Sequence, residues 1–336
     1  MTRSICPWTR ALLAWLLLAL PTLAQQGIQR PNLGEGPTQL RTQVFALDID
    51  EIDSASQSFT ANLFVSVRWQ DDRLAHAGPG NRTMGVNEAW SPNLQFVNQQ
   101  KVFRTFPEML TVTPSGEVIY RQRVWGQFSQ KLQLQDFPFD DQRFQAILVP
   151  SLPDVSLDDV VMVKDEEHPS GLDPNYSLPD WSIVSWEVGA TDYNPAGIAD
   201  PDPAYVFAFE TRRHVGYYYF KVILPLMLIV AMSWIVFWID PKEMGTQVSI
   251  AVTSMLTLIA YRFMVGQDLP NVSYLTRMDL FILGSTVIVF VSLFEAVLTG
   301  VLAKGERVRA ARAIDWISRI LFPVSSALVA YLTLVH

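Results

Sequence analysis

Four long apolar segments occupy the C-terminal third of this 336-residue chain, and they constrain its fold more than any other feature. Each approaches the roughly 20 residues that a helix needs to cross a bilayer. A segment inside lipid must satisfy its own backbone hydrogen bonds, so the sequence predicts four transmembrane helices. The segments are Tyr217–Ile239, Gly245–Val265, Leu280–Ala303 and Trp316–Leu334.

The charges beside these segments predict their orientation. Between the third and fourth segments, Lys304, Arg307, Arg309 and Arg312 stand against the single acid Glu306. Short loops rich in lysine and arginine remain in the cytoplasm. We therefore expect this link to be cytoplasmic and both ends of the membrane part to lie outside.

The first 24 residues have the features of a secretory signal peptide. Arg3 and Arg10 precede the apolar run Ala11–Leu20, and small residues ending at Ala24 offer a cleavage site. A membrane anchor is the alternative, but the apolar run is short for one. Cleavage would remove Cys6, the only cysteine, so we expect a mature chain without a disulfide or a cysteine-ligated metal.

Charge is distributed unevenly along the chain. Residues 25–213 hold 26 acidic and 14 basic side chains, within a whole-chain net charge of −8. An acidic region repels nucleic acid and concentrates cations, although ordinary solubilising charge explains it equally well. The sequence has no hydrolase, nucleotide-loop or zinc motif, and its four histidines are scattered. We expect no enzyme activity and no cofactor, and the sequence leaves metal binding open.

The region between the signal peptide and the membrane part has the pattern of a β domain. Six segments approximately alternate apolar and polar residues, and turn-forming residues separate them. They are Gln43–Ile49, Phe59–Trp69, Val118–Val124, Gln142–Val149, Ile183–Val188 and Tyr205–Thr211. Such spacing is typical of a sandwich. We predict an α+β multi-domain membrane protein, with an immunoglobulin-like extracellular β-sandwich at 25–215 and a four-helix transmembrane bundle at 216–336.

The second apolar segment carries a polar stripe. Positions three and four apart share one face of a helix, and this face contains hydroxyl groups and one central leucine. Its members are Ser249, Thr253, Leu256, Ala260 and Phe263. Small and polar residues also mark helix-packing seams in membranes, so the stripe alone is compatible with a seam or with a water-filled axis.

Several short motifs then occur in one order along the chain. The motif Phe137-Pro138-Phe139-Asp140 is similar to the aromatic-Pro-x-Asp signature of the pentameric ligand-gated ion channels, the Cys-loop receptor superfamily. The cysteines that close this loop in animal members would fall at Gln130 and Phe144, and their absence is the pattern of bacterial members. Further motifs that resemble the family are Trp69-Gln70-Asp71-Asp72-Arg73-Leu74, Trp90-Ser91-Pro92-Asn93 with Asn98, Arg213 twelve residues before Pro225, Leu269-Pro270 with Tyr274, Thr276 and Asp279, and Arg319 with Pro323.

The resemblance implies a ring of five identical subunits in a bacterial inner membrane, with the sandwich in the periplasm. It implies a channel that an agonist opens, with inorganic ions, chiefly Na⁺ and K⁺, and membrane lipids as its other partners. In the family, the residues that couple the sandwich to the pore correspond to Pro138, Asp140, Arg213 and Pro270. A membrane-anchored sensor that does not conduct ions is the rival reading, although one crossing would suffice for it.

The same resemblance assigns roles in the pore. The second helix would face the axis, and five Leu256 side chains would form an apolar gate that closes by dewetting. Cation channels of the family carry a glutamate before this helix, and Glu243 is the candidate here. We expect cation selectivity, but the register around Glu243 differs slightly from the family pattern and leaves its position open.

The agonist site is the least complete match. In the family an aromatic box between subunits binds the agonist, and cations are attracted to such rings. The corresponding positions here are Phe64, Val97, Ser151, Tyr193, Tyr205 and Phe207. Val97 and Ser151 replace expected aromatics, so protons or a divalent cation are alternative signals. The acidic runs Asp48–Glu51 and Asp165–His168 would supply carboxylates for them, although most such runs are solvated loops.

Overall fold

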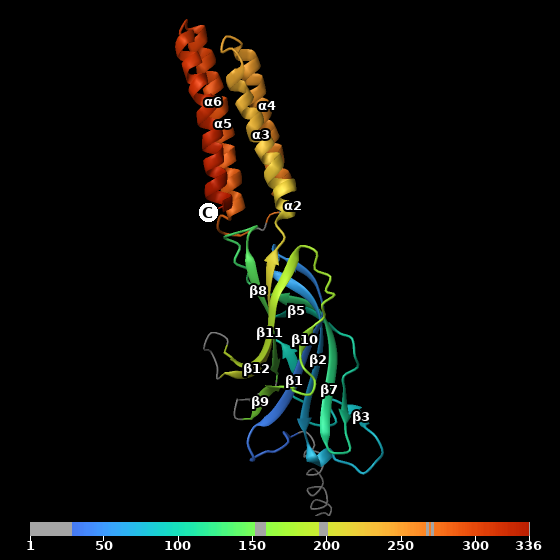
Figure 1. The fold of residues 1–336 in the computed structure, drawn as a ribbon. Coiled ribbons are helices and arrows are strands. Elements are labelled where there is room, and N and C mark those ends of the chain that lie inside the picture. Colours follow the sequence, from blue (N-terminus) through green and yellow to red (C-terminus); the bar gives the residue numbers. More distant parts are fainter. Residues whose placement is uncertain (1–28, 152–158, 195–200, 267–268, 270–271, 336) are drawn as a thin grey trace, which may run out of the picture.

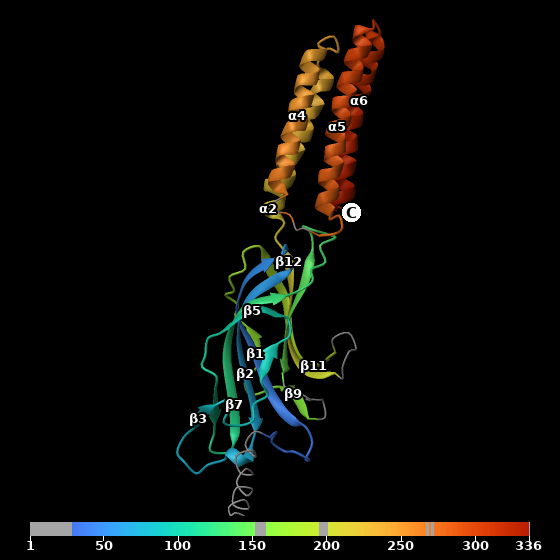
Figure 2. The same ribbon diagram turned by 180° about the vertical axis from the view of Figure 1, so that it is seen from behind.

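The computed structural model describes residues 29–151, 159–194, 201–266, 269 and 272–335. The proposed signal peptide and Pro270 lie outside these residues. An elongated β domain is followed by a bundle of long helices at one of its ends (Figure 1). The same two-part arrangement is seen from behind in Figure 2.

Two sheets form the β domain. The larger has the strand order β10-β1-β2-β7-β6-β3, with β5 paired to β7 and β9 paired to β1, and the smaller has the order β11-β12-β8-β4. The strands are β1 Thr38–Asp53, β2 Ser58–Gln70, β3 Arg82–Gly85, β4 Leu94–Phe96, β5 Gln99–Arg104, β6 Met109–Val112, β7 Glu117–Ser129, β8 Asp141–Pro150, β9 Val160–Lys164, β10 Gly171–Leu172, β11 Trp181–Tyr193 and β12 Asp202–Arg213. A 3₁₀ turn, η1, spans Asp72–Leu74.

Aromatic side chains join the two sheets. Phe59 of β2 packs against Phe144 of β8 and Phe209 of β12, each with ring centroids 5.4 Å apart. Phe128 of β7 stacks on Phe59 at 5.2 Å, and all four rings are buried. Edge-to-face and stacked rings stabilise a core beyond their buried area. The alternating strands predicted from the sequence therefore form the expected sandwich, and each predicted segment lies within an observed strand.

The helical part contains four helices that are long and apolar enough to cross a membrane, within the described residues. The first crossing, Gly216–Trp238, is built from consecutive helical turns: α2 Gly216–Tyr218, η2 Tyr219–Ile223, α3 Leu224–Trp234 and η3 Ile235–Trp238. The others are α4 Met244–Val265, α5 Arg277–Lys304, and α6 Val308–Ala330 continued by η4 Tyr331–Val335.

Two helices begin earlier than the apolar segments predicted. Helix α5 starts at Arg277 because Thr276 caps it: the Thr276 hydroxyl accepts a hydrogen bond from the Asp279 amide at 3.1 Å, and the Asp279 carboxylate accepts one from the Thr276 amide at 3.0 Å. Such a capping box satisfies the free amides of a helix start. Helix α6 starts at Val308 rather than Trp316, and its first two turns are rich in arginine.

Candidate functional site

The loop that contains Phe137-Pro138-Phe139-Asp140 lies at the junction between the two domains. It connects β7 to β8, and Pro138 is buried after a cis peptide bond. At its end, the Asp140 carboxylate accepts two hydrogen bonds from the Arg213 guanidinium, Nε to Oδ1 at 2.8 Å and Nη2 to Oδ2 at 3.0 Å. Both side chains are buried. The structure thus brings together the two charged coupling residues predicted from the sequence.

Further groups complete this ion pair. The Arg213 guanidinium lies 3.9 Å from the ring centroid of Trp181 and 4.8 Å from that of Phe137, and it donates to the Ser54 hydroxyl at 3.0 Å. The Gln142 amide donates to the Asp140 carboxylate at 2.7 Å. A planar guanidinium suits this combination of bidentate and stacked contacts, and a lysine would not reproduce it.

The same loop is also bound to the start of α5. The Arg277 amide donates to the Gln135 carbonyl at 3.0 Å, and the Met278 amide donates to the Phe137 carbonyl at 3.2 Å. The Tyr274 hydroxyl accepts a hydrogen bond from the Leu134 amide at 3.0 Å. These bonds connect the loop directly to Tyr274 and to the first residues of α5, so a movement of the loop would act on the start of this helix.

Two aromatic contacts connect the loop to the first crossing. The Phe137 ring meets Tyr218 edge to face, with centroids 5.0 Å apart, and Phe139 lies 5.9 Å from Tyr219. The Arg277 guanidinium lies 5.3 Å from the Phe139 ring and donates through Nε to the Thr333 carbonyl at 2.9 Å. The loop therefore contacts the beginnings of two crossings, and Arg277 extends the contact to the end of the last one.

Helix α4 presents two different faces. One face packs into its own bundle and is formed by Gln247, Ala251, Ser254, Leu258, Tyr261 and Val265. The predicted stripe lies on the opposite face: Ser249, Thr253, Leu256, Ala260 and Phe263 are all exposed in the single chain. Leu256 and Phe263 are 61% and 77% exposed, respectively. The stripe is therefore not a packing seam within the subunit, and it is free to face an axis.

Glu243 immediately precedes α4. The connection between the first crossing and α4 lies at the end of the bundle farthest from the sandwich (Figure 1). The Glu243 amide donates to the Asp240 carbonyl at 2.8 Å, and its own carbonyl accepts from the amides of Thr246 and Gln247 at 3.0 and 3.1 Å. The Glu243 side chain is exposed and forms no cap with the helix. A carboxylate in this position is available to ions at the end of the stripe.

Two of the predicted agonist residues do not face solvent. Tyr205 and Phe207 are buried: the Tyr205 hydroxyl lies 3.0 Å from the Ser170 hydroxyl, and Phe207 packs on Trp186 at a centroid distance of 6.4 Å. Burial raises the pKa of Tyr205, which keeps its hydroxyl neutral. In the single chain both rings belong to the sandwich core, which is the alternative reading for Phe207, and their part in an agonist site stays a prediction.

The other predicted residues of this site are more accessible. Phe64 is half-buried, Val97 and Ser151 are partly exposed, and Tyr193 is half-buried at the end of β11. Tyr193 lines a groove of about 600 Å³ on the β8–β12–β11 sheet. The groove is also lined by Arg143, Gln145, Glu187, Asp192 and Asn194. Its polar lining suits a ligand with charged or hydrogen-bonding groups.

Three exposed aromatic residues on or beside the larger sheet were not predicted from the sequence: Phe103 of β5, Phe106 between β5 and β6, and Trp125 of β7. Trp125 stacks on Phe103 with centroids 5.9 Å apart, and Phe106 meets Phe64 at 6.4 Å. Residues of a strand point alternately to its two faces, and Val124 and Gly126 of β7 are buried. Trp125 between them therefore lies on the outward face. This outward face therefore offers the aromatic surface that the core residues do not.

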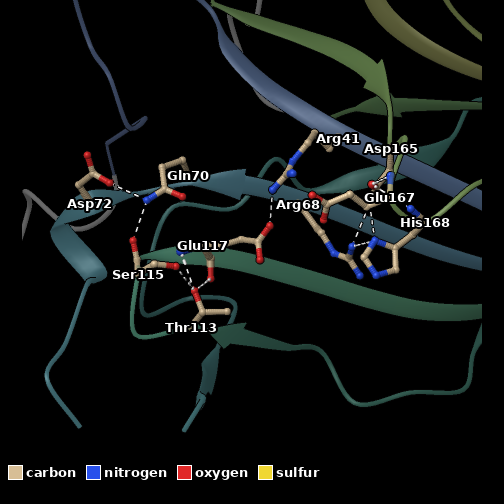
Figure 3. A network of polar contacts seen from close by, with 10 residues as sticks. All are labelled: Arg41, Arg68, Gln70, Asp72, Thr113, Ser115, Glu117, Asp165, Glu167 and His168. Atoms are coloured by element: carbon tan, nitrogen blue, oxygen red, sulfur yellow. Dashed lines mark hydrogen bonds and ion pairs between the residues drawn. The ribbon is translucent and has the colours of Figure 1, made fainter. Parts of the chain in front are cut away.

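The two acidic runs hold carboxylates that are already bonded. Asp165 is buried, forms an ion pair with the buried Arg68 at 3.0 Å, and accepts the amides of Glu167 and His168 (Figure 3). Figure 3 also shows Arg41 of β1 paired with Glu117 of β7. Among the described residues, no group of three or more histidine, cysteine or acidic side chains is arranged to hold a metal ion.

The carboxylate of Asp50 has a different environment. Partial burial raises its pKa, the hydrogen bond from the Trp125 indole at 2.7 Å opposes this effect, and the nearby charge of Asp48 adds to it. Asp48 itself accepts two hydrogen bonds from Ser177, at 2.6 and 2.9 Å. Asp50 therefore takes up a proton more readily than an ordinary aspartate.

Comparisons with known proteins agree with this two-part arrangement. The family model of the neurotransmitter-gated ion-channel ligand binding domain matches residues 25–149, and that of the neurotransmitter-gated ion-channel transmembrane region matches residues 222–305. Together the two models match more than half of the chain.

Relatives with curated names match across both domains. Gamma-aminobutyric acid receptor subunit beta-4 of Gallus gallus is 25% identical over 280 residues, which are 79% of this chain and 56% of the relative. Gamma-aminobutyric acid receptor subunit rho-2 of Homo sapiens is 27% identical over 275 residues, covering 79% of this chain and 59% of the relative. The chain thus spans a little over half of the length of these relatives.

Proposed function

Because this chain belongs to the family of neurotransmitter-gated ion channels, we propose that it forms a ligand-gated, cation-conducting channel of five identical subunits. Each subunit would contribute its α4 stripe to a central pore in a bacterial inner membrane, with the sandwich in the periplasm. The observation that carries this proposal is the stripe itself: its residues are exposed opposite the buried face of α4.

Leu256 is the proposed gate. Five leucine side chains at one level of a pore exclude water, whereas the hydroxyl groups of Ser249 and Thr253 below them can substitute for part of an ion's hydration shell. Leu256→Ser would leave the ring wet, so we expect current without any activating ligand. The measurement is single-channel recording of the purified full chain in planar bilayers.

The matched control is Leu328→Ser, which changes a similarly exposed leucine that lies on α6 and not on the pore helix. We expect this variant to stay closed in the absence of ligand. A Leu256→Ser channel that stays as tightly closed as the wild type would contradict the gate, and a purified chain that never conducts would contradict the channel itself.

Cation selectivity is the finer part of the proposal. Support comes from Glu243 beside the pore helix and from the acidic sandwich, since carboxylates favour cations. Chloride selectivity is the alternative, because the gamma-aminobutyric acid receptors are anion channels. Replacing Na⁺ and then Cl⁻ in recordings of Leu256→Ser separates the two: a reversal potential that follows chloride would overturn cation selectivity.

We further propose that the agonist binds between subunits, where the outward face with Phe64 and Trp125 would meet the groove beside Tyr193 of the next copy. The groove's polar lining supports a small charged agonist, and gamma-aminobutyric acid is the first compound to test. Opening by protons is the alternative, favoured by the raised pKa of Asp50. Steps to acid pH without added compound, compared between wild type and Asp50→Asn, distinguish it from an agonist.

A further inference from the structure

The turn between the first crossing and α4 has a defined geometry that depends on Asp240. One oxygen of the Asp240 carboxylate accepts a hydrogen bond from the Lys242 amide at 3.1 Å, and the Asp240 carbonyl accepts from the Glu243 amide at 2.8 Å. Aspartate commonly fixes turns in this way. The backbone of Glu243 is therefore placed by its bonds to Asp240 on one side and by the first turn of α4 on the other.

Helix α6, which is remote from the stripe, is bonded to this turn at two points. The Arg312 guanidinium donates to the second oxygen of the Asp240 carboxylate at 3.0 Å. Two helical turns later, Arg319 donates through Nε to the Phe237 carbonyl at 2.9 Å, and its guanidinium lies 5.6 Å from the Trp238 ring. Residues seven apart lie on one face of a helix, so this face of α6 follows the end of the first crossing.

We propose that Arg312 is a positioning residue for Glu243: through Asp240, the outermost helix sets where the carboxylate ring stands at the cytoplasmic mouth. This inference rests on the proposed function, since it takes Glu243 as the group that selects cations. Arg312 does not itself contact the ions. Its effect passes along the hydrogen bonds from α6 to Asp240 and from Asp240 to Glu243.

The size of the effect is limited by exposure. The Arg312 and Asp240 side chains are 60% and 42% exposed, and an exposed ion pair is weak. The Lys242 amide, followed by Arg312, lowers the pKa of Asp240, so the carboxylate remains charged at neutral pH. We expect a change of about two- to fivefold in permeability ratio rather than a loss of conduction.

The direction of the change in cation permeability distinguishes a positioning role of Arg312 from a simple effect of its positive charge. Removing a positive charge near the mouth raises the local cation concentration and should increase cation permeation. Loss of the turn geometry should decrease it. Arg309 provides the matched control, because it lies on the same helix and forms no hydrogen bond or ion pair within the described part of the chain.

The experiment measures the Na⁺/Cl⁻ permeability ratio from reversal potentials, in the Leu256→Ser background so that no agonist is needed. We expect Arg312→Gln to lower the ratio about two- to fivefold, Arg309→Gln to leave it unchanged or raise it, and Arg312→Lys to retain most of it. Asp240→Asn should lower the ratio too, and the double variant should be no worse than Asp240→Asn alone. Size-exclusion chromatography confirms that each variant assembles.

Glu243→Gln is the reference variant that distinguishes the positioning role of Arg312 from the proposed role of Glu243 in selectivity. If it lowers the ratio while Arg312→Gln behaves like Arg309→Gln, the positioning role of Arg312 is overturned and the proposed selectivity stands. If Glu243→Gln changes nothing, or the background passes no current, the proposed function fails and the positioning role falls with it. Additive effects of Arg312→Gln and Asp240→Asn would also overturn the inference.

Discussion

The sandwich and the helical bundle distribute their apolar side chains in opposite ways. In the sandwich, large side chains such as Trp69, Phe59 and Phe144 form a fully buried core between the sheets, and only a few aromatic residues are exposed. In the bundle, Phe290 and Trp316 are among many large apolar residues that lie outside. The sandwich therefore closes its core within one chain, whereas the bundle leaves a broad apolar surface that lipid can cover.

Buried acidic side chains in the two regions also differ in their hydrogen bonds. The described ion pairs of the sandwich include the fully bonded pair Arg213–Asp140. In the bundle, Glu295 and Asp315 are buried with carboxylate oxygens that have no hydrogen-bond partner among the described residues. An acid buried inside a membrane segment without such a partner is costly to the stability of the bundle. The ion pair Arg213–Asp140 lies at the junction between the sandwich and the bundle.

The largest effect is expected from Arg213→Ala at that junction. Removing one partner leaves the Asp140 carboxylate buried and unpaired, which costs about 3–5 kcal/mol. We expect the response to the activating ligand to be lost, or shifted by more than about 100-fold in concentration, in channels that still reach the membrane. The measurements are current recording and surface labelling of the same preparations.

Arg212→Ala is the control for Arg213→Ala. Arg212 forms a similar two-point contact with Asp141, at 3.1 and 3.2 Å, but both side chains are exposed. Exposed pairs contribute little, so we expect a nearly normal response. Equal effects of the two substitutions would show that burial at the junction is not what matters for coupling.

A smaller effect tests how tightly each region is packed. A Cβ on Gly126 of β7 would lie 2.2 Å from the Lys101 carbonyl oxygen and 2.6 Å from the Val102 Cα. These are backbone atoms of the paired strand β5, so they cannot move aside cheaply. We expect Gly126→Ala to cost about 1–3 kcal/mol and to lower the unfolding temperature of the sandwich by several degrees, measured by tryptophan fluorescence.

The bundle offers the matching substitution. A Cβ on Gly300 of α5 would also be too close, but to the side chain of Met244, which is flexible and can repack. We expect Gly300→Ala to change the unfolding temperature by less than Gly126→Ala. Gly189→Ala, where no atom lies within 4 Å, controls for the change of residue type. If Gly300→Ala lowered the unfolding temperature as much as Gly126→Ala, the proposed difference in packing between the bundle and the sandwich would be contradicted.

Local patterns were sufficient to predict the six longest sandwich strands and the four long apolar helices, because alternation and apolar length report burial directly, whereas the shorter strands β3 to β6, β9 and β10 were not predicted. The same patterns did not predict the first residue of α5. Helix α5 begins with the polar cap Thr276, which a search for apolar residues does not register.

The site was predicted in part. The stripe on α4 follows from helical spacing alone, whereas the pairing of Asp140 with Arg213 joins residues 73 apart and came only from the family resemblance. The contact of Arg312 with Asp240 could not be predicted at all, since both lie in exposed polar segments with many equivalent charges. Long-range contacts between such residues depend on how the helices pack.

The smallest effect is expected from Tyr274→Phe. The phenylalanine keeps the ring but leaves the Leu134 amide without the Tyr274 hydroxyl that accepts its hydrogen bond at 3.0 Å. One such bond contributes about 1 kcal/mol, so the ligand concentration for half-maximal current should shift about fivefold. Tyr176→Phe removes the same kind of bond inside the sandwich, where the Ile183 amide donates to the Tyr176 hydroxyl at 3.3 Å. We expect Tyr176→Phe to lower thermal stability slightly and to leave the half-maximal concentration unchanged. If both substitutions shifted the response equally, the junction would have no special part in coupling, and the sandwich as a whole would transmit the signal.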